Sequence, residues 1–405
     1  MLKELAWRAL TKASPYGPDI DLGKVAASVI GESRTVASHI SSAPREALSS
    51  AKELGLDLES SPATYLQVDR GDVYTAVSRR LAELGVMVMS IEEAAAKLPW
   101  VEKYLWRAIL VDSDKYTAFT ELFGRHGYFI YVPRGTRVRE PISACLYIHR
   151  PGTAQLVHNI VVVEEGAELN LVTACWAMPT RALHIGVSEF YVGKGARLTF
   201  TMVHRWREGV DVRPRAAAIV EDGGEFVNYY VHLGSARSLQ MFPTAILRGS
   251  NARAYLTSIV SARSSSTLDI GGRVIIEGVD SRGEVASRAL VADSSRVWLR
   301  GELVAKNVGR GHIDCKALKL SSESLAEAIP SIRSLVKEAM LTHEAAIGTI
   351  SRDEVEYLMS KGFSENEATS IIVRGFLEIG IENMPSRLRN YIDRTLDQVA
   401  RAATL

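Results

Sequence analysis

A cysteine and a His–Glu pair near the C-terminal end of the chain could do chemistry together. Cys315 precedes His343, and Glu344 follows directly. A thiolate and an imidazole that lie close together can share a metal ion or activate each other. Whether these side chains meet depends on the strands that carry them.

The middle of the chain repeats with a nearly constant period. Six short turns begin at positions 164, 193, 221, 249, 280 and 308, so successive starts differ by 29, 28, 28, 31 and 28. Most turns have Gly or Asn at the third position and all have Gly or Ala at the fourth, residue types that tolerate tight or left-handed backbone. Apolar strands flank the turns. One turn type per period predicts a stacked parallel β-helix, whereas a β-sandwich would have turns about every 8–12 residues.

This period predicts where Cys315, His343 and Glu344 lie relative to one another. It puts Cys315 and His343 at equivalent places on adjacent coils, about 5 Å apart between their backbones. Strand alternation then turns Glu344 to the opposite face. A register shift of one residue would reverse these faces. From the repeat period alone, the simpler interpretation is therefore a core cysteine near an ordinary histidine.

A second thiol, Cys175, is predicted to point into the same interior. It has the same parity as Leu169, Leu171 and Thr173 in an apolar strand. Five coil spacings separate it from Cys315, which is about 24 Å. The two thiols therefore cannot ligate one small cluster within a chain. They are either two stations along the solenoid or two unrelated buried cysteines.

Helices are expected at both ends of the repeat. Residues 43–56, 72–86 and 90–106 are rich in helix formers, and Pro99 should break the last segment. Near the C-terminus, Ser351–Glu354 and Ser364–Glu367 fit capping boxes. Helices are predicted over 367–380 and 385–402, with Gly362 ending the helix before them. The predicted domains are 1–115, 116–348 and 349–405.

Composition excludes several classes of protein and site. The net charge of +1 argues against a general nucleic-acid binder, and the lack of an apolar run of about 18 residues argues against a transmembrane helix. The N-terminal residues lack a signal-peptide pattern, so a cytoplasmic location is expected. Three cysteines without CxxC argue against a disulfide framework or a self-contained zinc site. The sequence contains neither a P-loop, nor a serine nucleophile elbow, nor HExxH.

Most of six further polar residues in the strands are expected to be structural or solvent-facing. The six are His158, His184, His204, Trp206, Arg215 and His232.

Several stretches together resemble the SufB/SufD family of iron–sulfur cluster assembly scaffold proteins, over roughly residues 114–380. They are "DKYTAFTELFGRHGYFIYVPRGTRVREPI", the segment from "EEGAELNLVTACW" to "TMVHRW", "FPTAILRGSN" and "THEAAIGTISRDEVEYLMSKGFSENEATSIIVRGF". The last stretch is the most specific. The resemblance implies a right-handed parallel β-helix between helical end domains.

The resemblance also implies roles for particular residues. Cys315 matches a cysteine that builds the nascent cluster. His343–Glu344 match the neighbouring HE pair, in which the glutamate is the better supported cluster residue. Cys175 matches a cysteine proposed to accept sulfur as a persulfide. Thiolate and imidazole are ligands that suit iron.

The implied activity is that of a scaffold rather than of an enzyme. Iron and sulfide would assemble at the interface of a dimer with itself or with a SufB/SufD-type partner, and a separate donor would supply the sulfur. A SufC-type ABC ATPase would dock on the C-terminal helical domain and alone bind ATP. An apolar face there could serve docking or pack on the chain's own β-helix; it consists of Leu388, Tyr391, Ile392, Leu396 and Val399.

Two alternatives stay open. The HE pair and the two thiols favour the SufB branch. Gly348, in contrast, resembles SufD, an accessory subunit without the main cluster thiol, and the chain is short for SufB. From another class, a β-helix enzyme acting on polysaccharide would need exposed carboxylates or basic residues on one lateral face.

Overall fold

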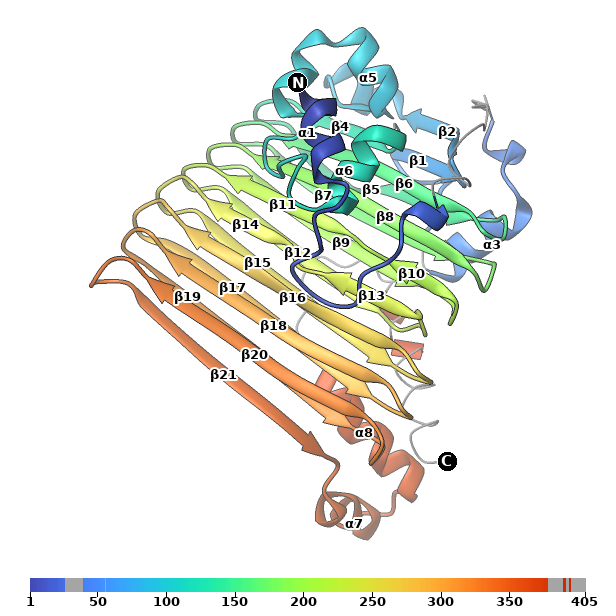
Figure 1. Ribbon diagram of the computed structural model, residues 1–405, viewed down its shortest axis with the longest axis vertical. Coiled ribbons are helices and arrows are strands. Elements are labelled where there is room, and N and C mark those ends of the chain that lie inside the picture. The colour runs from blue at the N-terminus through green and yellow to red at the C-terminus, as the bar shows by residue number, and fades with distance from the viewer. Residues whose placement is uncertain (26–38, 55, 125, 378–388, 391–392, 395–405) are drawn as a thin grey trace.

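The computed structural model shows a solenoid of about 8 turns, mainly of strands, which confirms the predicted parallel β-helix (Figure 1). It describes residues 1–25, 39–54, 56–124, 126–377, 389–390 and 393–394. Each turn contributes strands to two facing sheets, and equivalent strands of successive turns pair in parallel. The apolar core lies between the sheets.

Within the described part of the chain, one sheet has ten strands and runs the length of the solenoid. Its order is β2-β1-β5-β7-β9-β12-β15-β17-β19-β21. The bounds in chain order are β1 Ala63–Val68, β2 Gly71–Val77, β5 Arg137–Ile148, β7 Glu168–Ala177, β9 Arg197–Arg205, β12 Glu225–His232, β15 Arg253–Ala262, β17 Ser281–Val291, β19 Gly309–Lys319 and β21 Met340–Thr349.

The second sheet faces the first across the core. Its main path is β10-β13-β16-β14-β11-β8-β6-β4-β3, and β18 and β20 extend it from β16. The bounds are β3 Met87–Ser90, β4 Tyr128–Val132, β6 Ala154–Val163, β8 Ala182–Val192, β10 Val210–Val212, β11 Arg215–Val220, β13 Ser238–Met241, β14 Thr244–Leu247, β16 Thr267–Ile276, β18 Arg296–Ala305 and β20 Leu325–Ser334.

The turns explain the period. Gly166, Gly195, Gly223 and Asn251 have left-handed backbone, as their place in the first four turns predicts. In the fifth turn the left-handed residue is Asp280, two residues before the position that the turn pattern assigns to it. Because Arg253 pairs with Arg282, that period is as long as the first one, and the solenoid is more regular than the sequence indicated.

Helices cover the outer faces near the N-terminus. They are α1 Leu2–Ala9, η1 Ile40–Ser42, α3 Arg45–Glu53, α4 Arg79–Glu83, α5 Ile91–Lys97, η2 Pro99–Tyr104 and α6 Lys115–Phe123. The break at Pro99 is confirmed. The helix predicted over 72–86 is wrong, because its first part is strand β2, antiparallel to β1, and only a short helix follows. Val77 and its neighbours favour a strand, and the residues that favour a helix begin only after them.

The C-terminal segment leaves the last strand and forms helices α7 Arg352–Ser360 and α8 Glu365–Leu377. The capping box at Ser364 is confirmed, since its backbone N–H donates to Glu367 Oε2 at 2.8 Å. Ser351 is an N-cap without a side-chain hydrogen bond. Helix α8 packs Val373 and Leu377 on the outer face of the ten-stranded sheet.

The helix predicted over 385–402 and its apolar face lie outside the described residues. None of the described helices has the length and apolar character to cross a membrane.

Candidate functional site

Cys315 lies on the inner face of β19, one strand from the end of the described sheet. It belongs to the core and is fully buried. Burial and the charge of Asp314 raise the pKa of the Cys315 thiol to about 11. The free chain therefore holds this cysteine as a neutral thiol near pH 7.

The pairing of β19 with β21 differs by two residues from the pairing that the repeat period predicts. Cys315 pairs with Ala345, and His343 pairs with Ile313. The last period is longer than the one before it, because two more residues connect these strands than connect β17 to β19. His343 still shares the inner parity of Cys315, as a diagonal neighbour roughly 8 Å away between backbones.

Glu344 points to the other face of the sheet, as strand alternation predicts. Its carboxylate lies 3.0 Å from Lys316 Nζ. Lys316 also contacts Asp314, which pairs with Arg288. Burial opposes ionisation of Asp314, but the hydrogen bond and charge of Arg288 lower its pKa below the ordinary value. Within one chain, Cys315 and Glu344 thus belong to different surfaces.

Strand β21 forms an open end of the solenoid (Figure 1). Most of its residues are exposed, including His343, Glu344 and Ile347. Exposed apolar side chains also lie nearby at Leu335 and Met340. An exposed edge strand with an apolar fringe is a surface that a second chain can cover.

Cys175 lies inside the solenoid on β7, with the inward parity that the sequence predicts. It is fully buried, and burial raises the pKa of the Cys175 thiol well above its ordinary value. Four strands lie between β7 and β19, so five spacings separate the two thiols, in agreement with the predicted distance of about 24 Å.

Two histidines meet Cys175 in the interior. His204 pairs with Cys175 on the next strand, and His184 comes from β8 on the facing sheet. One ligand atom from each residue lies within 4.8 Å of the other two. The sequence predicts both histidines only as structural or solvent-facing residues. His204 lies one repeat period after Cys175, so the period could have identified it. The period does not predict which residue of the facing sheet lies opposite Cys175, so it could not identify His184.

Each of the two imidazoles forms a hydrogen bond with another buried side chain. His184 Nδ1–H donates to Gln155 Oε1 at 3.0 Å, and His204 Nδ1 lies 2.9 Å from the Tyr230 hydroxyl. Burial lowers the pKa of His184 to about 3. Burial and the neighbouring histidines lower the pKa of His204 well below its ordinary value. Both rings are therefore neutral at pH 7.

Polar side chains lie along the inner face over much of the distance between the two thiols, with an interruption at Met202. The strand register places Tyr230, Ser258 and Ser287 in one ladder that ends at Cys315. The same ladder continues backwards through Met202 to Thr173, two residues before Cys175. Hydroxyl groups thus follow the interior from one cysteine towards the other.

Two of the remaining polar residues singled out by sequence, His158 and Arg215, hold the fold together. His158 Nε2 lies 2.8 Å from the Glu189 carboxylate, which is also buried. Arg215 Nε donates to Asp114 Oδ2 at 2.7 Å and so ties β11 to the start of α6. These contacts fit the structural role expected of His158 and Arg215.

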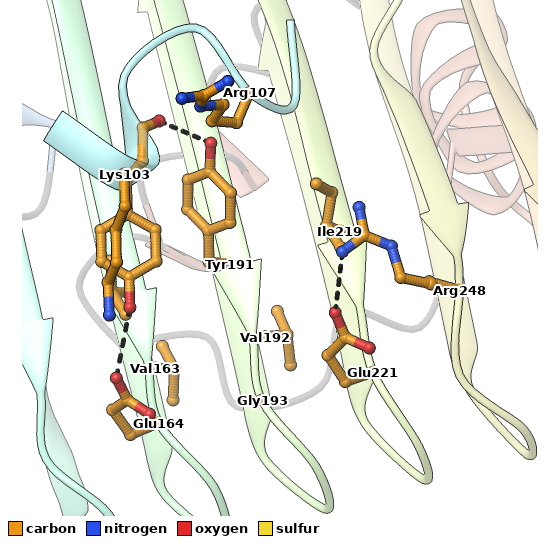
Figure 2. Close-up of a pocket in the computed structure, with 12 residues that line it drawn as sticks. Lys103, Arg107, Val163, Glu164, Tyr191, Val192, Gly193, Ile219, Glu221 and Arg248 are labelled. Carbon is orange, nitrogen blue, oxygen red and sulfur yellow. Dashed lines mark hydrogen bonds and ion pairs between the residues drawn. The ribbon is translucent and has the colours of Figure 1, made fainter.

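A cavity of about 520 Å³ lies on the outer face of the second sheet, beside η2. Figure 2 shows its two carboxylates already engaged: Glu164 accepts from the Tyr104 hydroxyl at 3.3 Å, and Glu221 pairs with Arg248. Burial and the nearby Glu164 charge raise the Tyr104 pKa far above its ordinary value, so its hydroxyl stays a donor. A pair of free carboxylates, as a polysaccharide-cleaving enzyme would need, is not what this cavity presents.

Comparison with known proteins agrees with these features. Residues 146–376 match the SUF system FeS cluster assembly, SufBD core domain, and residues 58–144 match the SufBD protein N-terminal region. An iron–sulfur cluster assembly SufBD family protein from Methanothermobacter thermautotrophicus is 40% identical over 401 residues, 97% of each chain.

Two more relatives carry the same family description. The protein from Archaeoglobus fulgidus is 41% identical over 355 residues, which cover 86% of this chain and 94% of the relative. The protein from Staphylococcus saprophyticus is 27% identical over 319 residues, 77% of this chain and 68% of the relative. The chain therefore belongs to the SufBD family of iron–sulfur cluster assembly proteins.

Proposed function

We propose that this chain is a cytoplasmic scaffold subunit on which iron and sulfide assemble into a nascent cluster at a subunit interface. The observation that carries the proposal is the position of Cys315, an inward thiol one strand from an open, apolar-fringed end of the solenoid. His343 lies on the last strand and shares its face. Membership of the SufBD family supports the proposal that an iron–sulfur cluster is assembled at this end of the molecule.

The interface requires a second chain. Cys315 and His343 are two ligands on one face, and Glu344 is on the other, so one chain presents too few ligands on one side for a closed cluster. A second copy, or a SufB/SufD-type partner, that covers β21 would bury Leu335, Met340 and other exposed apolar residues. It would also bring its own ligands to Cys315.

Cys175 is the proposed sulfur acceptor. Its thiolate would attack the outer sulfur of a donor persulfide, forming Cys175–S–SH, breaking the donor's S–S bond and releasing the donor as a thiolate. Conversion of that sulfur to sulfide needs two electrons from an external reductant. The ladder of hydroxyls towards Cys315 supports an interior route, since it offers hydrogen-bond donors to an anionic sulfur species.

The ATP-hydrolysing partner would dock on the C-terminal helices. Tyr357, Met359, Phe363 and Ile371 are exposed apolar side chains of α7, α8 and their connection. Such a patch fits a SufC-type ABC ATPase, which would supply the ATP site that this sequence lacks.

The test is anaerobic co-expression with such an ATPase, followed by iron and acid-labile sulfide per protomer. Wild type should carry both, and Cys315→Ser should lose both while staying folded and bound to the ATPase. Cys145→Ser is the matched control, because Cys145 is also fully buried but lies among the residues that pack under α3 on the outer face.

Equal loading of wild type and Cys315→Ser would refute the role of Cys315. It would instead favour a SufD-like accessory subunit, in which Cys315 is a core thiol. The same conclusion would follow if neither wild type nor Cys315→Ser carried metal although the complex with the ATPase formed.

A further inference from the structure

We propose that Cys175, His184 and His204 form a binding site for a single divalent transition-metal ion inside the β-helix. This site is about five strand spacings from Cys315 and uses no residue of the proposed cluster interface. The inference goes beyond the proposed function, because metal binding here needs neither a partner chain nor sulfur transfer. The site shares Cys175 with the proposed sulfur transfer, so a bound ion and a persulfide at Cys175 exclude each other.

The donor set and its spacing fit such an ion. The three ligand atoms lie within 4.8 Å of one another. Around a tetrahedral ion with bonds of about 2.0–2.3 Å, ligand atoms are about 3.3–3.8 Å apart. Small side-chain rotations of Cys175 and the two histidines would close the difference. One sulfur and two nitrogens suit Zn²⁺ or Fe²⁺ rather than Mg²⁺ or Ca²⁺.

The histidines are oriented as metal ligands usually are. Gln155 accepts from Nδ1–H of His184 and leaves Nε2 for coordination. Gly186 keeps the space beside that nitrogen clear, since a Cβ there would lie 2.9 Å from it. His204 is held through Nδ1 by Tyr230, and coordination selects the tautomer in which Nδ1–H donates to the hydroxyl.

One nitrogen of this cluster, His204 Nε2, is fully buried and has no hydrogen-bond partner among the described residues. A buried polar atom without a partner costs about 1–3 kcal/mol. A metal ion would satisfy it, while the Cys175 thiol would give up its proton to become the thiolate ligand.

A small internal cavity borders one of the three ligands. It has a volume of about 20 Å³, enough for one water molecule, and is lined by His184, Met202 and Tyr230 among others, but not by Cys175 or His204.

Trp206 separates the site from the surface. Its ring centroid lies 5.0 Å from that of His184 and 5.1 Å from that of His204. The same residue lines an external cavity of about 530 Å³, together with Arg205, Arg207 and Glu46. An ion could reach the site from this cavity when the Trp206 side chain moves.

Cobalt is a suitable probe, because thiolate coordination produces a charge-transfer absorption and tetrahedral geometry produces visible d–d bands. The purified full-length chain is titrated anaerobically with Co²⁺ and then with Zn²⁺. We expect one Co²⁺ per chain, with both sets of bands, displaced by Zn²⁺. Tryptophan fluorescence should fall with the same stoichiometry, since Trp206 touches both histidines.

Variants identify the ligands. Cys175→Ser should lose the charge-transfer band, and His204→Gln should bind Co²⁺ at least tenfold more weakly while its amide still reaches Tyr230. Cys145→Ser and Cys315→Ser should bind like wild type. Circular dichroism checks that each variant is folded, and Zn²⁺ should raise the Tm of wild type but not that of Cys175→Ser.

The inference is wrong if folded wild type binds no Co²⁺, or if the charge-transfer band survives in Cys175→Ser. It is also wrong if Cys315→Ser abolishes the band. These outcomes are separable from those of the proposed function, because cluster loading in the complex depends on Cys315 and this titration does not.

Discussion

Replacement of Glu189 by glutamine tests how the N-terminal segment is fastened to the solenoid. The Glu189 carboxylate is fully buried on β8. Its Oε1 accepts from the backbone N–H of Trp106 at 2.7 Å and lies 2.8 Å from His158 Nε2. Its Oε2 accepts from the N–H groups of Arg107 and Ala108, each at 2.7 Å.

The cost follows from these contacts. Ile109 N–H, at 3.2 Å, and the Tyr191 hydroxyl, at 2.9 Å, complete the shell of donors around Oε2. The amide group of glutamine must replace one oxygen, and the cheaper choice is Oε1. The Trp106 N–H then faces another donor, which costs about 1–3 kcal/mol, and the remaining bonds lose the strengthening of an ionised acceptor. We expect Glu189→Gln to lower the free energy of unfolding by about 3–5 kcal/mol.

The effect should depend on pH. Burial alone would raise the pKa of Glu189, but the His158 hydrogen bond and the backbone N–H groups lower it below its ordinary value. A carboxylate with a depressed pKa stabilises the fold fully above its unfolded-state pKa, and that stabilisation disappears as pH falls through the folded-state value. The difference between wild type and Glu189→Gln should therefore be full at pH 7 and shrink once the pH falls below the ordinary glutamate pKa of about 4.3.

The assay is urea unfolding followed by tryptophan fluorescence at pH 7 and pH 3.5. Glu165→Gln is the control, because Glu165 pairs with Arg134 at an exposed site and should change stability by less than about 0.5 kcal/mol. A stabilising role for the Glu189 carboxylate is refuted if Glu189→Gln unfolds no more easily than this control at pH 7, or if the difference grows as the pH falls.

Three other predictions concern the open end, the turns and the thiols. Ile347→Asp, at an exposed position of β21, should leave the chain folded but convert the proposed dimer to monomer in size-exclusion chromatography; an unchanged elution volume would place the interface elsewhere. Gly278→Ala should lower stability by about 2–3 kcal/mol, since its Cβ would lie 1.8 Å from Gly249 O between stacked turns; thermal unfolding at wild-type Tm would contradict this. Cys315 should react slowly with iodoacetamide at pH 8, because burial raises its pKa to about 11; alkylation at the rate of a free thiol would refute its burial.

The solenoid was predictable because its constraints are local. Residues such as Gly166 and Asn251 occupy left-handed positions that few other residue types tolerate, so the turns recur visibly in the sequence. Inward parity of Cys175 followed from alternation in an apolar strand. The segment 72–86 misled because its second half carries helix formers, while pairing with β1 decides the first half.

The candidate site was predictable only in part. A constant period cannot foresee two extra residues before β21, and these shift Cys315 from opposite His343 to opposite Ala345. His184 reaches Cys175 across the core from the facing sheet, a contact that depends on how two sheets face each other rather than on spacing along the chain.

The most direct test of the central claim is the position of iron in the loaded assembly. Anomalous diffraction at the iron absorption edge, on anaerobic crystals of the chain with the proposed ATPase partner, locates the metal without assumption about ligands. We predict an iron peak within bonding distance of Cys315 Sγ, at the interface formed by β21 and a second chain. Iron found away from Cys315, with the β21 end empty, would contradict this prediction.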